Sequence, residues 1–238
     1  MKKIILLTLV ASISLAGLAC VPFGSIVGRG PVETHTQDFS GFTQLEISST
    51  FDVEVVRDSA YSVSVTTNQN IFDYLDISKD GDTLKIRLKN GSYTVASLKA
   101  RVTMPELVSL EVNGASHATM SGFTTSQAMK FTASGASTLT GDIACKQVKL
   151  EAGAASHFEL SGSADTADIE LTAASNANLE KMIVGDARIK LGGAASMTID
   201  VRGKLDANVS GASNLRWLGT PTLGDVKITG ASSFSKKS

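Results

Sequence analysis

The chain has 238 residues, of which 42% are hydrophobic and 19% are charged, and this length suffices for one large domain or two small ones. Lysine plus arginine (22) nearly balance aspartate plus glutamate (23), and the formal net charge is −1. This charge excludes the basic footprint of a nucleic-acid-binding protein and of a basic membrane-binding surface.

The first twenty residues have the composition of a secretory signal. Lys2 and Lys3 precede a long apolar run, and small residues lead from that run to Cys20. The run is shorter than the about 20 residues that a membrane-spanning helix needs. We therefore predict a signal peptide over residues 1–19, removed at the bond before Cys20.

Cys20 is the predicted site of lipid attachment. A cysteine directly after a small residue resembles the lipobox of bacterial lipoproteins; Leu18 and Ala19 fit that pattern, whereas Gly17 stands where leucine is usual. Ordinary secretion, with cleavage at the same bond, is the alternative. Residues 20–30, rich in glycine, proline and valine, are predicted to be a tether between the lipid and the folded part.

The sequence contains only two cysteines, Cys20 and Cys145. If Cys20 carries a lipid, Cys145 has no disulfide partner, and its strand-like surroundings predict a small buried hydrophobic residue. A disulfide between the two is the alternative. No Cys-x-x-Cys spacing is present, so the cysteines predict no metal site.

Residues 31–106 are predicted to form a β-rich region without obvious repeats. Alternation places Phe51, Val53 and Val55 on one face of a strand, and a similar run, "DTLKIRL", follows between two glycine turns. A further strand is expected to stop at Pro105. The segment "NIFDYLDIS" is the only candidate for a short helix or an irregular link in this region.

Residues 107–238 contain an internal repeat. Its motif is Gly or Ala, then Ala, then Ser, and it recurs at spacings of 17 to 21 residues. A period of this kind indicates a repeat architecture rather than a catalytic motif. The motif serines are Ser116, Ser137, Ser156, Ser175, Ser196, Ser213 and Ser232.

Short alternating runs flank each motif, and no copy has room for an amphipathic helix. One copy alone does not bury its apolar side chains, whereas stacked copies do. The repeat therefore predicts a parallel β-helix whose coils of about 19 residues stack about 4.8 Å apart. The fold class is all-β.

The motif itself is predicted to form a corner of the coil. Glycine tolerates a positive φ there, and small alanine and serine side chains avoid crowding against the same corner of the next coil. We expect Ala155→Leu to destabilise the protein far more than Lys149→Leu. Whether alanine or serine points inward stays open, and the "KLGGAAS" copy, with one extra residue before its motif, predicts a β-bulge.

The chain from about residue 39 to residue 238 resembles the head GIN domain family, found in bacterial envelope lipoproteins and described as auto-transporter adhesins. The resemblance is carried by "FSGFTQLEISSTFDVEVVRD", "DTLKIRL", "VTMPELVSLEVNGAS", the Gly-Ala-Ser units and "LGTPTLGDVKITGAS". It implies a strand-rich lead-in, a right-handed β-helix and a role at the cell surface. It implies no catalytic residues and no cofactor.

An enzyme is the second interpretation, because parallel β-helices include polysaccharide lyases and hydrolases. Arg188-Ile189-Lys190 looks like a substrate-binding tripeptide of polygalacturonases, but it equally describes a strand with two solvated charges around a core isoleucine. Asp168 and Glu170, one repeat earlier, would then pair with these bases as a charge ladder. The aspartates that such an enzyme would cluster are scattered, mostly at expected turns: Asp142, Asp165, Asp168, Asp186, Asp200 and Asp206. We predict no enzyme and no catalytic residues.

The histidines predict no metal site. His117 and His157 both follow a motif serine, two coils apart, so about 10 Å separates them, too far to share one ion. A polar exposed stripe is the expected role of their column, and His35 has no visible partner. The column reads His117, Thr138, His157, Asn176, Met197, Asn214 and Ser233.

Three functions are compatible with these patterns. The first is an envelope or surface lipoprotein, anchored by lipid and facing out of the cytoplasm, whose β-helix binds an unidentified glycan or protein. The second is a carbohydrate-active β-helix enzyme. The third is a self-assembling β-helix scaffold, and the signal peptide counts against a cytosolic filament of this sort. We predict the first, with the oligomeric state left open.

Overall fold

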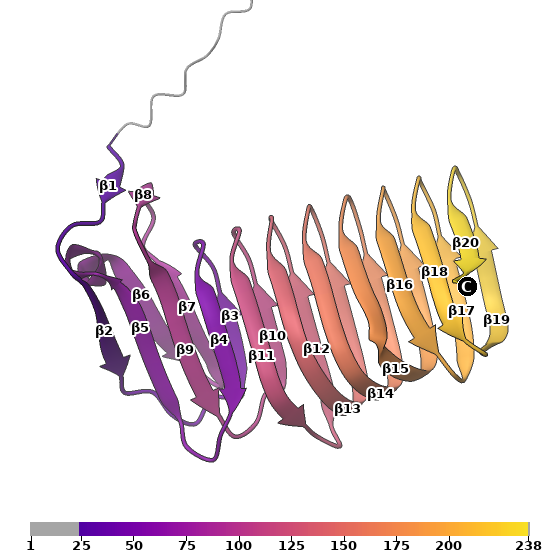
Figure 1. The fold of residues 1–238 in the computed structure, drawn as a ribbon, viewed down its shortest axis with the longest axis horizontal. Helices are drawn as coiled ribbons and strands as arrows, with labels where there is room; N and C mark the ends of the chain where they lie inside the picture. The colour runs from indigo at the N-terminus through magenta and orange to yellow at the C-terminus, as the bar shows by residue number, and fades with distance from the viewer. Residues whose placement is uncertain (1–23, 238) are drawn as a thin grey trace, which may run out of the picture.

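The computed structural model describes residues 24–237 and shows a right-handed parallel β-helix, as predicted. The predicted signal peptide and Cys20 lie outside the described residues. Figure 1 shows the coils side by side along the long axis, from the N-terminal strands in indigo to the C-terminal strands in yellow. Among the described helices, none is long and apolar enough to cross a membrane.

The strands follow one another along the described residues with one short 3-10 helix between them. In chain order the elements are β1 (Ile26–Val27), β2 (Val32–Gln37), β3 (Gln44–Ile47), β4 (Asp52–Arg57), β5 (Ser62–Asn68), η1 (Gln69–Tyr74), β6 (Leu75–Asp80), β7 (Thr83–Leu88), β8 (Tyr93–Thr94), β9 (Leu98–Met104), β10 (Ser109–Val112), β11 (His117–Thr124), β12 (Ala128–Ala133), β13 (Thr138–Ala152), β14 (His157–Leu171), β15 (Asn176–Leu191), β16 (Ser196–Val201), β17 (Lys204–Val209), β18 (Asn214–Gly219), β19 (Thr222–Ile228) and β20 (Ser233–Lys236).

The coils have two faces, each a ladder of parallel strands. We call the first the amide–hydroxyl face; it contains β9, β4, β11, the first halves of β13, β14 and β15, and then β16, β18 and β20. We call the second the charged face; it contains β7, β3, β10, β12, the second halves of β13, β14 and β15, and then β17 and β19. The three long strands run from the first face to the second without interruption, which joins the ladders.

The core lies between the two faces and consists of aligned apolar side chains. Because side chains alternate along a strand, every second residue of each face points inward. Strand register places the same core position of successive coils in one column, so each new coil covers the apolar surface of the last. One such column contains Leu110, Phe131, Leu150, Ile169 and Ile189, all at most 1% exposed.

The strand-rich region before the repeat extends the same two ladders. β3 pairs with β10, and β4 pairs with β11, while β7 and β9 form the next coil outward. Antiparallel strands then close this end, with β5 beside β9, β2 beside β5, and β6 beside β7. The buried side chain of Ile71, in η1, plugs the core there.

The individual elements predicted for this region are confirmed. Phe51, Val53 and Val55 are fully buried, and β9 ends at the residue before Pro105. The segment proposed as a short helix forms η1 and then continues as β6.

The predicted tether over residues 20–30 is too long at its C-terminal end. Ile26 and Val27 form β1, which pairs in parallel with Tyr93 and Thr94 of β8. The amide of Ile26 donates to the carbonyl of Ser92 at 2.8 Å, so the folded part begins by residue 26. Residues from 24 onward thus contain every described strand and the whole core.

The repeated motif forms a four-residue corner that leads from the charged face to the amide–hydroxyl face. Its second residue has a positive φ in every coil, for example 75° at Gly135, 57° at Ala154 and 78° at Gly211. A side chain on Gly211 would lie 2.3 Å from the carbonyl oxygen of Gly193 in the preceding coil. Left-handed backbone and close stacking together explain why only glycine or alanine occupies this position in the repeat.

Serine, and not alanine, points inward at the corner. Ser156 is 1% exposed, and its hydroxyl shares its one proton between the carbonyl of Gly153 in its own turn and that of Ala133 in the preceding coil, the latter at 2.9 Å. The preceding Ala155 is exposed. The crowded column is therefore the serine column, and the expectation that Ala155→Leu is far more harmful than Lys149→Leu loses its basis because both side chains face solvent.

One motif serine, Ser196, was assigned to the wrong column. Strand pairing places Ser196 opposite Asn176 and Asn214, so Ala195 takes the buried place that serine holds in neighbouring coils. The corner 192–195 has the same four residues as the others, and no bulge forms there. The apparent extra residue arose from aligning serine with serine, although buried alanine fits the same space.

The serine column gives a matched pair of substitutions. Ser156→Ala removes this shared hydrogen bond from a buried corner, and we expect the free energy of unfolding to fall by about 1 kcal/mol. Ser116 occupies the same position, but its buried hydroxyl has no hydrogen-bond partner among the described residues. Ser116→Ala should therefore leave stability unchanged or raise it. Urea unfolding measures both, and an equal loss in the two variants would contradict the role given to the hydroxyl.

Candidate functional site: a furrow on the charged face

Outward side chains of the charged face form rows that run across the coils. Each row contains the residues that strand register places opposite one another, at the spacing of adjacent strands. One row contains Lys130, Lys149, Asp168, Arg188 and Asp206. The next row contains Thr132, Glu151, Glu170, Lys190 and Asn208.

The predicted charge ladder is present in register and is partly closed by ion pairs. Asp168 lies opposite Arg188, and Glu170 lies opposite Lys190, whose Nζ is 2.6 Å from the carboxylate. Ile189 between the two bases is buried, as expected for a strand with solvated charges on either side of a core residue. Exposed pairs of this kind contribute only about 0–1 kcal/mol each.

A second cluster of charges lies on the neighbouring coils. Glu151 accepts from Lys130 at 2.8 Å and from Lys149 at 2.7 Å. These two hydrogen-bonded ammonium groups lower the pKa of the Glu151 carboxyl. Two ammonium groups share one carboxylate, so this cluster keeps a net charge of +1.

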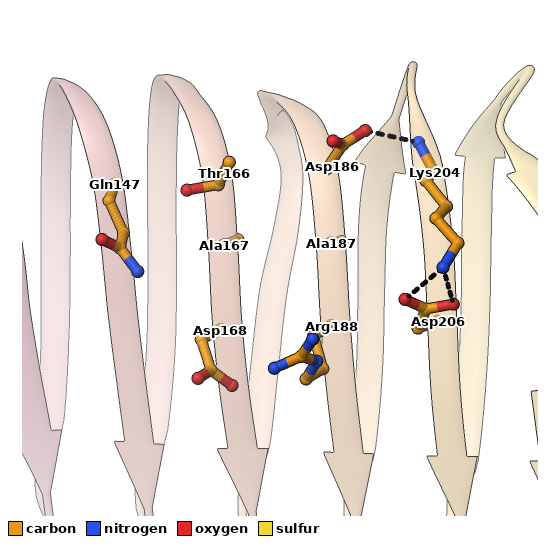
Figure 2. A pocket seen from close by; sticks show the side chains of 9 residues that line it. All are labelled: Gln147, Thr166, Ala167, Asp168, Asp186, Ala187, Arg188, Lys204 and Asp206. Atoms are coloured by element: carbon orange, nitrogen blue, oxygen red, sulfur yellow. Dashed lines mark hydrogen bonds and ion pairs between the residues drawn. The ribbon is translucent and has the colours of Figure 1, made fainter. Parts of the chain in front are cut away.

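A shallow depression of about 360 Å³ lies along the first row, beside charged groups that make no ion pair (Figure 2). Its floor is formed by Ala167 and Ala187, whose small side chains are buried. A neighbouring depression of about 380 Å³ shares Arg188 and Asp206 and continues to Asp225 and Lys227 on β19. We call the two together the furrow. Its first part is lined by Gln147, Thr166, Ala167, Asp168, Asp186, Ala187, Arg188, Lys204 and Asp206.

Two aspartates of the furrow hold successive coils together. The carboxylate of Asp186 accepts the backbone amide of Lys204 at 2.7 Å, and that of Asp206 accepts the amide of Asp225 at 2.8 Å. Glycine makes room for the second bond, since a Cβ on Gly224 would lie 2.1 Å from the Asp206 carboxylate. Each carboxylate accepts a hydrogen bond from the backbone of the next coil, which explains why these aspartates occur at turns.

The charge on Asp206 is further fixed by Lys204. The Lys204 ammonium lies 2.9 Å from the Asp206 carboxylate (Figure 2). This hydrogen bond, with that from the Asp225 amide, lowers the pKa of Asp206, while the carboxylate raises the pKa of Lys204. Asp206 therefore stays ionised at neutral pH and is unsuited to act as a general acid.

Asp168 and Arg188 are two free charged groups in the first part of the furrow. Within residues 24–237 neither side chain makes an ion pair or a hydrogen bond, although they lie on adjacent coils and Figure 2 shows them side by side. An acceptor and a donor are thus presented next to each other. This arrangement is suited to holding polar groups of a ligand.

The histidines lie where the sequence placed them, with one correction to their column. His117 and His157 sit two coils apart on the amide–hydroxyl face, and Thr138 separates them. Ser196, and not the buried Met197, continues the column. No group of metal-ligating residues forms among the described residues.

His35 has a partner that the sequence did not reveal. Its ring stacks on Phe72 of η1 at 3.8 Å between centroids, and its Nε2 lies 3.2 Å from the Glu33 carboxylate. This contact fastens β2 to the N-terminal end of the β-helix. It belongs to the packing of that end and is remote from the furrow.

Cys145 is confirmed as a small buried residue. It is 8% exposed in β13 and is a free thiol. Burial, with a smaller effect of Asp165, raises the pKa of the Cys145 thiol to about 11. The thiolate is therefore scarce at neutral pH, which makes the residue unreactive.

Comparison with known proteins gives the same architecture. The model of a family described as "Putative auto-transporter adhesin, head GIN domain" matches residues 41–221. The crystal structure of "a putative adhesin" from Bacteroides fragilis superposes with a TM-score of 0.84 at 14% identity, covering 90% of this chain and 100% of that one. Comparison with curated proteins found no match.

Two further crystal structures share the fold. A "Putative lipid binding protein" from Parabacteroides distasonis has a TM-score of 0.74 at 21% identity, covering 90% of this chain and 100% of that chain. A "putative adhesin" from Parabacteroides merdae has a TM-score of 0.70 at 15% identity, covering 90% and 99%. At these identities the likeness shows the fold.

The coil-linking role of Asp206 predicts a pH-dependent loss of stability. The folded protein lowers the pKa of this carboxyl, so its contribution is present above the unfolded value of about 3.9 and is lost as the pH falls through the folded value. Asp206→Asn should lower the melting temperature at pH 7, and the difference from wild type should shrink as the pH falls below the unfolded value of about 3.9. Asp168→Asn, on an unpaired carboxylate, is the control and should change neither. A pH-independent effect of Asp206→Asn would contradict the role of its charge.

Proposed function

Because this chain belongs to the head GIN domain family of auto-transporter adhesins, we propose that it is a lipid-anchored envelope protein whose furrow binds an extended, hydroxyl-rich ligand. The family points to a role in adhesion at the cell surface. The lipid anchor, the binding surface and the ligand class are our proposals.

The position of β1 supports attachment at one end of the molecule. Cys20 precedes the first described residue, Gly24, by a few positions, and β1 lies at the N-terminal end of the stack (Figure 1). A lipid on Cys20 would hold that end near the membrane. The two long faces would then be open to ligands beside the anchored molecule.

The unpaired Asp168 and Arg188 carry the proposal of a ligand. A sugar hydroxyl both donates and accepts hydrogen bonds, and the furrow offers acceptors and donors on consecutive coils. Gln147, Thr166 and Lys204 add further polar groups along the same line. An extended glycan therefore fits better than a compact solute, and an extended protein segment is the alternative ligand.

The same geometry argues for binding without cleavage. Glycoside hydrolysis needs one protonated and one ionised carboxyl facing the scissile bond. In the furrow, Asp186 and Asp206 are engaged by backbone amides, and Asp206 is kept ionised by Lys204. We propose that the protein is not an enzyme.

The anchor is tested by Cys20→Ala. We expect wild-type protein to carry an acyl label and to partition into detergent, and the variant to lose the label and be released. Cys145→Ala, at a buried thiol, is the matched control and should remain membrane-bound. Wild-type protein free in the medium without label would refute the anchor.

The furrow is tested by a polysaccharide binding panel with the chain from residue 24 onward. We expect at least one hydroxyl-rich polysaccharide to bind and Arg188→Ala to weaken that binding about tenfold, since a hydrogen bond from a charged donor is lost. Arg216→Ala, an exposed arginine on the amide–hydroxyl face, is the control and should bind as wild type.

Product analysis of the same samples separates binding from catalysis. No new reducing ends or unsaturated sugars should form, with or without calcium. Turnover that disappears in Arg188→Ala and Asp168→Asn while folding stays intact would establish an enzyme instead.

A further inference from the structure

The two ends of the β-helix are closed differently. At the N-terminal end, η1 and the antiparallel strands cover the core, and Phe42 and Ile71 there are fully buried. At the other end, β19 and β20 form the last described coil (Figure 1). Its inward side chains stay open to solvent, with Leu223 48%, Val226 36% and Ile228 40% exposed.

An open coil of this kind has two unsatisfied features. The outer edge of β19 presents backbone amides and carbonyls that no strand of the described chain pairs with, and such edges are templates for another strand. Solenoids need a polar cap over a terminal repeat, and the apolar side chains of β19 provide none. Within residues 24–237, this end of the core is therefore left uncovered.

The charges of β19 identify the cover as a second copy of the same strand. Asp225 and Lys227 flank Val226, both line the furrow, and neither side chain has an ion-pair partner among the described residues. In an antiparallel pair centred on Val226, each Asp225 lies opposite Lys227 of the other copy. Directly opposed side chains are close enough for ion pairs. We propose that the protein forms a two-fold dimer through its C-terminal coils, with β19 antiparallel to β19.

The alternative two-fold arrangement fits less well. Pairing β19 with β20 of the second copy would bring Lys227 toward the strand that ends at Lys236 and is followed by Lys237. Like charges opposed across strands are unfavourable. In the chosen arrangement Val226 of one copy lies opposite Val226 of the other, Ile228 lies opposite Gly224, and each β-helix continues into the other.

The dimer has a consequence that rests on the proposed anchor. β1, the first described strand, lies at the opposite end from β19, so anchors attached before it in the two copies of a dimer would point in opposite directions. Dimerisation through the free tips would join proteins on two facing membranes. The contact itself does not depend on Cys20.

Charge reversal gives a direct test with the chain from residue 24 onward. Sedimentation should show a dimer for wild type. Asp225→Lys opposes two lysines, and Lys227→Asp opposes two aspartates, so each variant should dimerise at least roughly tenfold more weakly. An equimolar mixture of the two variants should recover the dimer, because the lysine introduced in one chain then lies opposite the aspartate introduced in the other. Both sites are exposed, so folding should be unaffected.

Bead aggregation then tests the two-membrane arrangement. Beads that carry one variant each, attached through residue 24, should aggregate only when the two sets are mixed. A monomeric wild type, or single variants that dimerise as well as wild type, would overturn the contact. Failure of Cys20 lipidation would leave the sedimentation result intact, so the two proposals fail separately.

Discussion

The parallel hydrogen-bonded ladder imposes one requirement on everything else: each coil must lie on a nearly identical coil. Two backbones about 4.8 Å apart leave no space for a bulky group at a turn that repeats. The corner shows this most clearly, since its second residue is left-handed in every coil of the repeat and, where it is glycine, backbone atoms of the previous coil lie close to it. Glycine and alanine follow from the contact, and the inward serine follows from the carbonyls that the turn leaves free.

The same requirement builds the outer surfaces. Register that aligns core side chains also aligns exposed ones, so charges are arranged in rows. Some of these charges neutralise one another, as Glu170 and Lys190 do within a row and Glu151 and Lys130 do between rows. The candidate site is the interruption in that pattern, where Asp168 and Arg188 face each other without an ion pair. A binding surface therefore arises here from the rows themselves and needs no separate loop.

The sequence predicted the architecture well because the repeat exposes the ladder directly. Strands, short helix, buried Cys145 and the opposition of Asp168 to Arg188 all follow from alternation and spacing. The direction of the corner side chains could not be predicted, because a turn breaks the alternation of a strand and the residue type alone does not determine the backbone angle φ. Ser196 was misplaced because serine and alanine are interchangeable in volume at a buried corner.

Other features depend on contacts between segments that are distant in the chain. The pairing of β1 with β8 and the stacking of His35 on Phe72 have no local pattern. The use of Asp186 and Asp206 as acceptors for the next coil is visible only once glycine and aspartate are brought together. These bonds decide which carboxylates are free, so sequence alone did not separate structural acids from available ones.

Because every corner has the same form, the number of coils alone sets the length of the β-helix. A copy of the motif with its flanking strands can be inserted or deleted between two others without a new kind of contact, because every coil offers its neighbour the same surface. Each such change would move the C-terminal tip by about one strand spacing while the N-terminal end stays as it is. The distance between the two ends of the molecule thus changes in steps of one coil. Selection for a longer or shorter molecule needs only duplication or loss of a repeat.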